Sequence, residues 1–282
     1  MTPYDTYLRA ERRINEGLIR LGLSLARPEG YVRDPEARMA AMRDFLDACG
    51  NPQRNLPALH VAGTSGKGSV CAAAASILRE SGLSVGLHVS PYLQSATEKI
   101  WIDGLFVDAL AFDELVEWVL PVARPRLRPE TPASIHGMAS VAVALEAFRR
   151  AEVDCIVFEA GCGARWDLTS LVETEVAVIT NVGLDHVVSL GPGIERIAWH
   201  KAGAARAGRP LVCGATSGPA AEVIRDEARR VGAEMVEVPP RGDAGDHNRR
   251  LAVRAAEELA GRLGRRLDPA AHRLDPAQVW RG

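Results

Sequence analysis

The stretch HVAGTSGKGSV, residues 60–70, is the strongest local signal in this chain of 282 residues. A short apolar strand over residues 59–62 runs into a glycine-rich turn, and a helix is predicted over residues 69–80. Backbone N–H groups in such a turn, with a helix N-terminus behind them, form a cradle for anions. Lys67 would then reach the β- and γ-phosphates of a nucleotide. The predicted phosphate-binding residues are Gly63, Thr64, Ser65, Gly66, Lys67, Gly68 and Ser69.

The spacing of this turn differs from the strict pattern GxxxxGK[ST]. Val61 stands at the first glycine position, and Gly68 separates Lys67 from Ser69. A flexible Gly/Ser turn is therefore the alternative interpretation. The order strand, turn, helix favours a nucleotide phosphate site instead.

Apolar runs and helical segments alternate along the rest of the chain, which predicts an α/β fold. The expected architecture is a mostly parallel sheet with helices on both faces, because buried parallel strands consist of continuous apolar residues. Right-handed crossovers place the carboxyl ends of these strands at one edge, where ligands bind. Strands are predicted at 59–62, 84–89, 155–159, 176–180 and 210–214, and helices at 4–25, 35–49, 69–80, 108–120, 134–150, 193–206, 220–231 and 248–263.

A Pro/Gly-rich segment at residues 238–245 predicts a boundary late in the chain. We expect residues 1–240 to form an ATP-binding domain. Residues 241–282 are expected to be the terminal helix and hinge region of the same domain.

Composition and charge exclude several classes of partner. A net charge of -2 and few aromatic residues give no reason to expect nucleic acid or an anionic membrane surface. The sequence has neither an apolar N-terminal signal nor a run of about 18 apolar residues. Scattered cysteines, with Cys71 and Cys155 read as buried thiols, fit a reducing compartment. These features predict a soluble, cytoplasmic protein.

Lysine is rare in this chain. Only Lys67, Lys99 and Lys201 contribute to the 34 basic residues, and the others are arginines. Lysines that are kept despite this bias are expected more often at sites that need a primary amine, because lysine and arginine differ chemically. Lys99 is predicted to be an ordinary surface cation.

Several motifs, in order, resemble one family. They are GNPQ at 50–53 with LPALHVAGTSGKGSV, HVSPYL at 88–93, EKIWIDG at 98–104, EAGCGARWDLTS at 159–170, and VITNVGLDHVVSLGPGIERIAWHKAG at 178–203. The chain looks like the N-terminal ATP-binding domain of the folylpolyglutamate and dihydrofolate synthases, in the Mur ligase superfamily. The resemblance implies a P-loop NTPase-like Mur ligase central domain. It also implies an activity: ATP phosphorylates a folate-type carboxylate, and the amine of glutamate attacks the acyl phosphate.

Candidate metal ligands follow from the same motifs. Glu159 ends a buried strand, where an acidic residue is either a Mg²⁺ ligand or a helix-capping carboxylate. Mg²⁺ prefers such a hard oxygen ligand beside nucleotide phosphates. By resemblance, Ser90 shares this ion and His186, in GLDH, binds a second Mg²⁺. A structural histidine is the alternative for His186.

Lys201, in HKAG, corresponds by resemblance to a lysine that is carbamylated in the family. A carbamate is anionic and can help to hold a metal, and a surface lysine at a helix end is the alternative. The resemblance thus implies catalytic roles for Lys67, Lys201 and His186. It also implies that Arg165, Trp166, Asp167 and Leu168 line the pocket of the acid substrate.

The chain departs from the family pattern on the substrate side and at its end. Ser134-Ile135-His136 replaces a phenylalanine–glutamate pair, and Trp166 and Leu168 replace different side chains. The family continues into a second α/β domain, whereas this sequence stops near the hinge. Four interpretations stay open: a fragment, a protein completed by a separate chain that supplies the C-terminal domain, a nucleotide-binding module without ligase activity, and a ligase for a non-folate acid.

Overall fold

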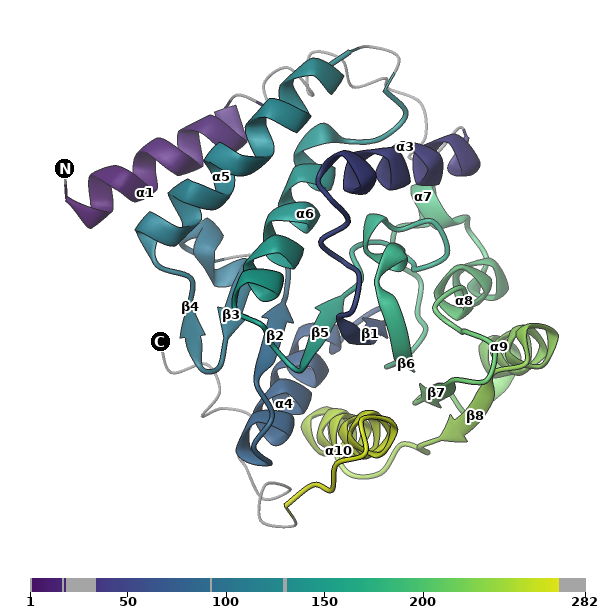
Figure 1. The fold of residues 1–282 in the computed structure, drawn as a ribbon. Helices are drawn as coiled ribbons and strands as arrows, with labels where there is room; N and C mark the ends of the chain where they lie inside the picture. Colours follow the sequence, from purple (N-terminus) through teal and green to yellow (C-terminus); the bar gives the residue numbers. More distant parts are fainter. Residues whose placement is uncertain (1, 17, 19–33, 92, 129–130, 269–282) are drawn as a thin grey trace.

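Eight strands form one sheet in the order β4-β3-β2-β5-β1-β6-β7-β8 in the part of the chain that the structure describes (Figure 1). The structure is a computed structural model, and it describes residues 2–16, 18, 34–91, 93–128 and 131–268. The strands are β1 (Pro57–Ala62), β2 (Val85–His88), β3 (Ile100–Ile102), β4 (Leu105–Phe106), β5 (Cys155–Glu159), β6 (Glu173–Ile179), β7 (Pro210–Cys213) and β8 (Glu234–Glu237). All pairings are parallel except those of β3 with β2 and with β4.

Helices cover both faces of the sheet, as predicted (Figure 1). They are α1 (Pro3–Glu11), α3 (Pro35–Ala48), α4 (Lys67–Glu80), α5 (Ala109–Ala123), α6 (Ile135–Arg150), α7 (Val187–Leu190), α8 (Ile194–Ala202), α9 (Gly218–Val231) and α10 (Ala244–Arg262). One face carries α4 and α10, which pack side by side. The other carries α1, α3, α5 and α6 over one half of the sheet, and α8 and α9 over the other half.

The central strand β1 is buried after its first residue, because it pairs with β5 and β6 and lies between two helical layers. Successive side chains of a strand point to opposite faces. Leu59 and Val61 therefore join the core under α4 and α10, while Ala58 joins the core under α5 and α6. Val61 is paired with Glu159 at the carboxyl ends of the two strands. The register places that carboxylate beside the glycine-rich turn.

Two parts of the sheet were not predicted. The first is the antiparallel hairpin of β3 and β4, which turns through Asp103 and Gly104, with φ of 48° and 99°. Positive φ at both central residues is the geometry of a tight hairpin turn, and Asp-Gly is a favoured pair for it. The second is the edge strand β8, which is only partly buried. Both lie at edges of the sheet, where the hydrophobic pattern is weak.

Most predicted elements agree with the structure within a few residues, and the differences are at their ends. Helix α1 ends at Glu11 and is followed by a π-helical turn over Arg12–Glu16. The prediction of a helix as far as Leu25, and most of the loop after it, lie outside the described residues. Helix α10 begins at Ala244, before the predicted start at residue 248.

Two further predictions concern membrane-spanning helices and the domain boundary late in the chain. No helix among the described residues is long and apolar enough to cross a membrane. The domain boundary near residue 240 stays a prediction, and the segment after residue 268 lies outside the described residues.

Candidate functional site

The glycine-rich turn joins β1 directly to α4, which starts at Lys67. Gly63 and Gly66 have φ of 152° and 78°, a region that favours glycine. Both are also tightly enclosed. A Cβ on Gly63 would lie 1.8 Å from Oγ1 of Thr180, and one on Gly66 would lie 2.7 Å from the side-chain amide of Asn248. The turn is therefore fixed in a shape that side chains larger than glycine do not allow.

Residues that follow β6 hold this turn in place. The Asn181 side chain accepts a hydrogen bond from the Ser65 N–H at 3.1 Å and donates to Ser65 O at 3.1 Å. Gly183 N donates to Oγ1 of Thr64 at 2.9 Å, and that hydroxyl donates to Gly183 O. Asn181 belongs to the motif at residues 178–203, but no role was predicted for it. The available signal was its position two residues after the end of the buried strand β6.

Lys67, Glu159 and Ser90 come together at the carboxyl edge of β1, β2 and β5. The Lys67 Nζ lies 4.0 Å from Oε1 of Glu159, and Ser90 N donates to Oε2 at 2.8 Å. Glu159 is 5% exposed, and burial raises the pKa of its carboxyl group, against the opposing effects of the Ser90 N–H and Lys67. A single buried carboxylate thus faces a cation and the start of the phosphate cradle.

This donor set fits Mg²⁺ held partly by a nucleotide. Mg²⁺ in nucleotide sites is bound by one or two carboxylates together with substrate phosphates and water. Glu159 would supply the carboxylate, and Ser90, whose backbone N donates to Oε2 of Glu159, is the residue whose hydroxyl would join it. No group of three or more His, Cys, Asp or Glu side chains able to hold a metal occurs within the described ranges.

Lys201 lies in the last turn of α8 and is 1% exposed, so it is not a surface lysine. Burial, followed by the positive charge of Lys67, lowers the pKa of Lys201 to about 8, while Asp185 acts in the opposite direction. A buried amine with a lowered pKa is partly neutral near physiological pH, and a neutral amine is the form that reacts with CO₂. Lys201 also lies close enough to Lys67 for the charges of the two lysines to interact.

His186 is placed differently from the other predicted ligands. It precedes α7 with a φ of 49°, its side chain is 50% exposed, and its Nε2 lies 3.6 Å from Oδ2 of Asp185. Leu184, Val187 and Val188 around it are exposed apolar residues. The structure thus places His186 on the surface of the loop after β6, and its metal role stays a prediction.

The residues predicted to line the acid pocket make internal contacts. Arg165 donates from Nε and Nη2 to Trp199 O, and it forms an ion pair with Glu227. Trp166 packs edge-on against Trp199, with ring centroids 5.2 Å apart. Their predicted contact with an acid substrate stays a prediction.

The next two residues of this segment are buried. Asp167 accepts hydrogen bonds from Cys162 N and Thr169 N, both at 3.0 Å. Leu168 is 7% exposed and lies against Gly137 of α6. These contacts hold the segment in the fold.

Lys99 is not the ordinary surface cation that was predicted. It is half-buried in a small cavity that also contains Asn15 and His136, and burial lowers its pKa. His136 shares a 3.0 Å hydrogen bond with Oδ1 of Asn15, and burial lowers its pKa to about 4. Ser134 caps α6 by accepting from Gly137 N at 3.1 Å. The divergent segment 134–136 therefore forms the start of a helix and part of this cavity.

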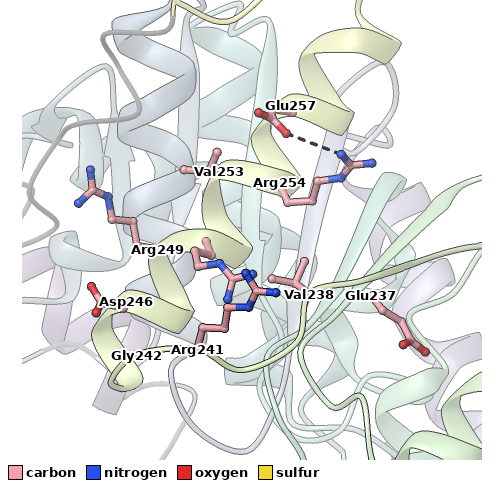
Figure 2. Close-up of a pocket in the computed structure, with 10 residues that line it drawn as sticks. Glu237, Val238, Arg241, Gly242, Asp246, Arg249, Val253, Arg254 and Glu257 are labelled. Carbon is pink, nitrogen blue, oxygen red and sulfur yellow. Dashed lines mark ion pairs between the residues drawn. The ribbon is translucent and has the colours of Figure 1, made fainter.

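A groove of about 620 Å³ lies on the outer face of α10 and not at the phosphate loop (Figure 2). Its charged side chains are largely paired. Figure 2 shows the ion pair of Arg254 with Glu257. In addition, Arg250 donates a hydrogen bond to Pro239 O at 2.8 Å, and Glu237 forms an ion pair with Arg225. The groove has no link to the Lys67–Glu159 site through a shared lining residue.

The chain is similar to known proteins of one family. Residues 61–203 match the Mur ligase middle domain. The dihydrofolate synthase/folylpolyglutamate synthase of Bacillus subtilis is 37% identical over 195 residues, which are 68% of this chain and 45% of that protein. The chain thus spans less than half the length of that relative.

Solved structures give the same result. A folylpolyglutamate synthase complex with AMPPCP and folate superposes with a TM-score of 0.80 at 28% identity, covering 92% of this chain and 70% of that one. The Mycobacterium tuberculosis folylpolyglutamate synthase complexed with ADP also gives a TM-score of 0.80, at 26% identity, covering 96% of this chain and 65% of that one.

Proposed function

Because the chain belongs to the Mur ligase family, we propose that it is the ATP-binding part of a ligase that joins glutamate to a folate-type carboxylate through an acyl phosphate. The observation that carries this proposal is the meeting of Lys67, Glu159 and the fixed glycine turn at the carboxyl edge of the sheet. The similarity to synthases that bind AMPPCP, ADP and folate supports it.

The phosphates of ATP lie in the turn of residues 63–69, where the N-terminus of α4 and its free N–H groups face them. Lys67 is the residue that stays in contact with the γ-phosphoryl group during its transfer. A fixed cation at this point stabilises the charge that spreads over the transferring oxygens. Asn181 and Thr64 contribute by holding the turn, so that little reorganisation is needed when ATP binds.

The reaction has two steps. An oxygen of the acid's carboxylate attacks the γ-phosphorus of ATP, and ADP leaves with the electrons of the broken P–O bond. The amine of glutamate then attacks the acyl carbon and loses a proton to solvent. Inorganic phosphate leaves and carries away one oxygen of the original carboxylate. The product is an amide.

Glu159 and Ser90 are the residues that would hold Mg²⁺ beside these phosphates, and such an ion would neutralise part of their charge. His186 would serve a second ion, reached from the loop after β6. Lys201 would act as its carbamate, which requires the neutral amine that burial favours. Lys67 and a carbamate at Lys201 carry opposite charges, so carbamylation also removes the repulsion between the two lysines.

Two more specific parts of this proposal are the identity of the acid substrate and the source of the C-terminal domain. Trp166 and the segment 134–136 differ from the family pattern, which favours testing acids other than folates as well. A separate chain that supplies a C-terminal domain is the partner for which this proposal allows, since the matched residues span 45% of the Bacillus subtilis relative. A module that binds ATP without ligating is the competing function.

The experiment measures ADP release with Mg-ATP, glutamate, and dihydropteroate or a reduced folate labelled with ¹⁸O in its carboxylate. It is run with the purified chain alone and with the C-terminal part of the Bacillus subtilis relative added. Glutamate-dependent turnover with one ¹⁸O in the released phosphate is expected. ATP binding without turnover in every mixture would instead indicate a binding module or another acid. Lys67→Ala is the matched control.

A further inference from the structure

The loop after Glu159 is attached to the helix that carries Lys201 through one arginine. The last four C=O groups of a helix have no partner inside it. In α8, two of them are taken by Arg165: its backbone N donates to His200 O at 2.9 Å, and its side chain donates to Trp199 O from Nε at 3.2 Å and from Nη2 at 3.0 Å. A cation at this end also complements the helix dipole. Arg165 therefore caps the turn that contains Lys201.

Arg165 is itself fixed by its surroundings. Its Nη2 forms an ion pair with Glu227 of α9, and its guanidinium lies 3.9 Å from the centre of the Trp199 ring. Trp166, the next residue, packs edge-on against the same ring and against His200. Nε and Nη2 of Arg165 thus bind groups of the protein itself, and these contacts set the direction of the guanidinium.

The loop and the helix also touch backbone to backbone. A Cβ on Gly203, directly after α8, would lie 2.3 Å from Cβ and 2.4 Å from Cα of Arg165. Gly163, with a φ of 72°, lies against His200 in the same way, its Cβ position 3.3 Å from the Cβ of that residue. Contacts this close allow the loop only one position relative to the helix.

The attached loop runs from Glu159 past Cys162, whose thiol lies within the electrostatic range of Lys201. We infer that Arg165 is a positioning residue, which holds the last turn of α8 against this loop and so fixes Lys201 relative to Glu159. The inference rests on the proposed function for the roles of Lys201 and Glu159. It replaces the predicted substrate contact of Arg165 with a contact that aligns two groups of the site.

The low lysine content gives a direct test. Protein labelled with ¹³C-lysine has only the signals of Lys67, Lys99 and Lys201, and Lys201→Met identifies the third. The first variant is Arg165→Gln, which removes the side-chain cap and the ion pair. The second is Arg165→Lys, which keeps the positive charge but lacks the planar guanidinium that donates two hydrogen bonds to Trp199 O. Arg196→Gln is the matched control, because Arg196 lies 4.3 Å from the same Trp199 ring but belongs to α8 and is exposed.

In Arg165→Gln, the Lys201 signal is expected to shift and broaden while the Lys99 signal and the affinity for ADP stay unchanged. The carbamate signal formed with ¹³CO₂ at a subsaturating concentration should fall about tenfold, the effect of losing a hydrogen bond from a charged group. Arg165→Lys should recover part of it, and Arg196→Gln should match the parent.

Three results would overturn the inference. The first is a folded Arg165→Gln whose Lys201 and carbamate signals equal those of the parent. The second is an equal effect of Arg196→Gln. The third is a higher KM for the acid with an unchanged kcat, which would restore the substrate role. A parent without any carbamate signal would refute the proposed role of Lys201, and the shift of the Lys201 signal would still decide the positioning role.

Discussion

The Nζ of Lys67 lies 4.0 Å from Oε1 of Glu159, at the point where the phosphate turn meets the end of β5. Lys67 is the first residue of α4, which follows β1 through the phosphate turn, and Glu159 is the last residue of β5. Strands β1 and β5 are paired in parallel, so that Val61 is opposite Glu159. A cation and a buried carboxylate at this distance stabilise each other without a direct hydrogen bond. A nucleotide phosphate and its metal would interact with both. In the proposed function, Lys67 would exchange its contact with Glu159 for one with a phosphate.

Lys67→Ala is expected to abolish measurable binding of Mg-ATP, with an affinity loss of about 100-fold or more, because a charged hydrogen-bond donor to phosphate is removed. Isothermal titration calorimetry with AMPPCP and Mg²⁺ measures it. Arg229→Ala removes an exposed cation from α9 and should bind as the parent does. Unchanged binding by Lys67→Ala would refute the assignment of the phosphate turn.

Gly63→Ala should unfold or distort the phosphate turn. Its Cβ would clash with Thr180, and its φ of 152° is unfavourable for alanine, so a destabilisation of at least about 2 kcal/mol is expected. Gly261→Ala is the matched control: it lies inside α10 with open space around it and should stabilise the protein by about 0.5–1 kcal/mol. Denaturant unfolding measures both free energies. Equal values for the two variants would contradict the described packing of the turn.

Strong local patterns explain which parts of the fold could be predicted. The turn at residues 60–70 and strand β5 were predicted because glycine chemistry and continuous apolar runs are local signals. The β3–β4 hairpin was missed although Asp103-Gly104 is a hairpin signal, because strands of two and three residues give no clear alternation.

The site was predictable only in part, because several of its contacts join distant segments. Asn248 lies far from Gly66 in the sequence, yet α10 brings its amide against Gly66 of the phosphate turn. Lys99 was predicted on the surface, since nothing local shows that it shares a cavity with His136. Arg165 was assigned by resemblance to the substrate, and its contacts with α8 and α9 depend on tertiary packing.

Two buried histidines should make the protein sensitive to acid. Burial lowers the pKa of His88 to about 3 and that of His60 to about 4, from an ordinary value of 6.5. Both residues are neutral in the folded protein, and their unfolded forms bind protons below pH 6.5. Their contribution to stability is therefore full above pH 6.5, and it falls as the pH is lowered from 6.5 towards 4 and 3.

His88→Phe tests this dependence. His88 is stacked on Phe158 with ring centroids 4.3 Å apart, so phenylalanine keeps an aromatic ring in place. Between pH 6 and 4 the unfolding free energy of the variant should fall less steeply than that of the parent, by up to about 1.4 kcal/mol per pH unit. Urea unfolding at several pH values measures both slopes. Parallel curves would show that His88 does not remain neutral in the folded state.

Lys201→Ala should lose glutamate-dependent ADP release and regain part of it with added formate, acetate or propionate. The reason is chemical: the proposed carbamate ends in a carboxylate-like group, and a small carboxylate can occupy the space left by the buried side chain. Lys201→Met fills that space with an apolar chain of similar length, so it should be inactive and resist rescue. Thermal unfolding of both variants controls for the loss of a buried residue. Full activity of Lys201→Met, with the fold intact, would exclude the carbamate, whereas rescue confined to Lys201→Ala would show that the site needs an anion at this position.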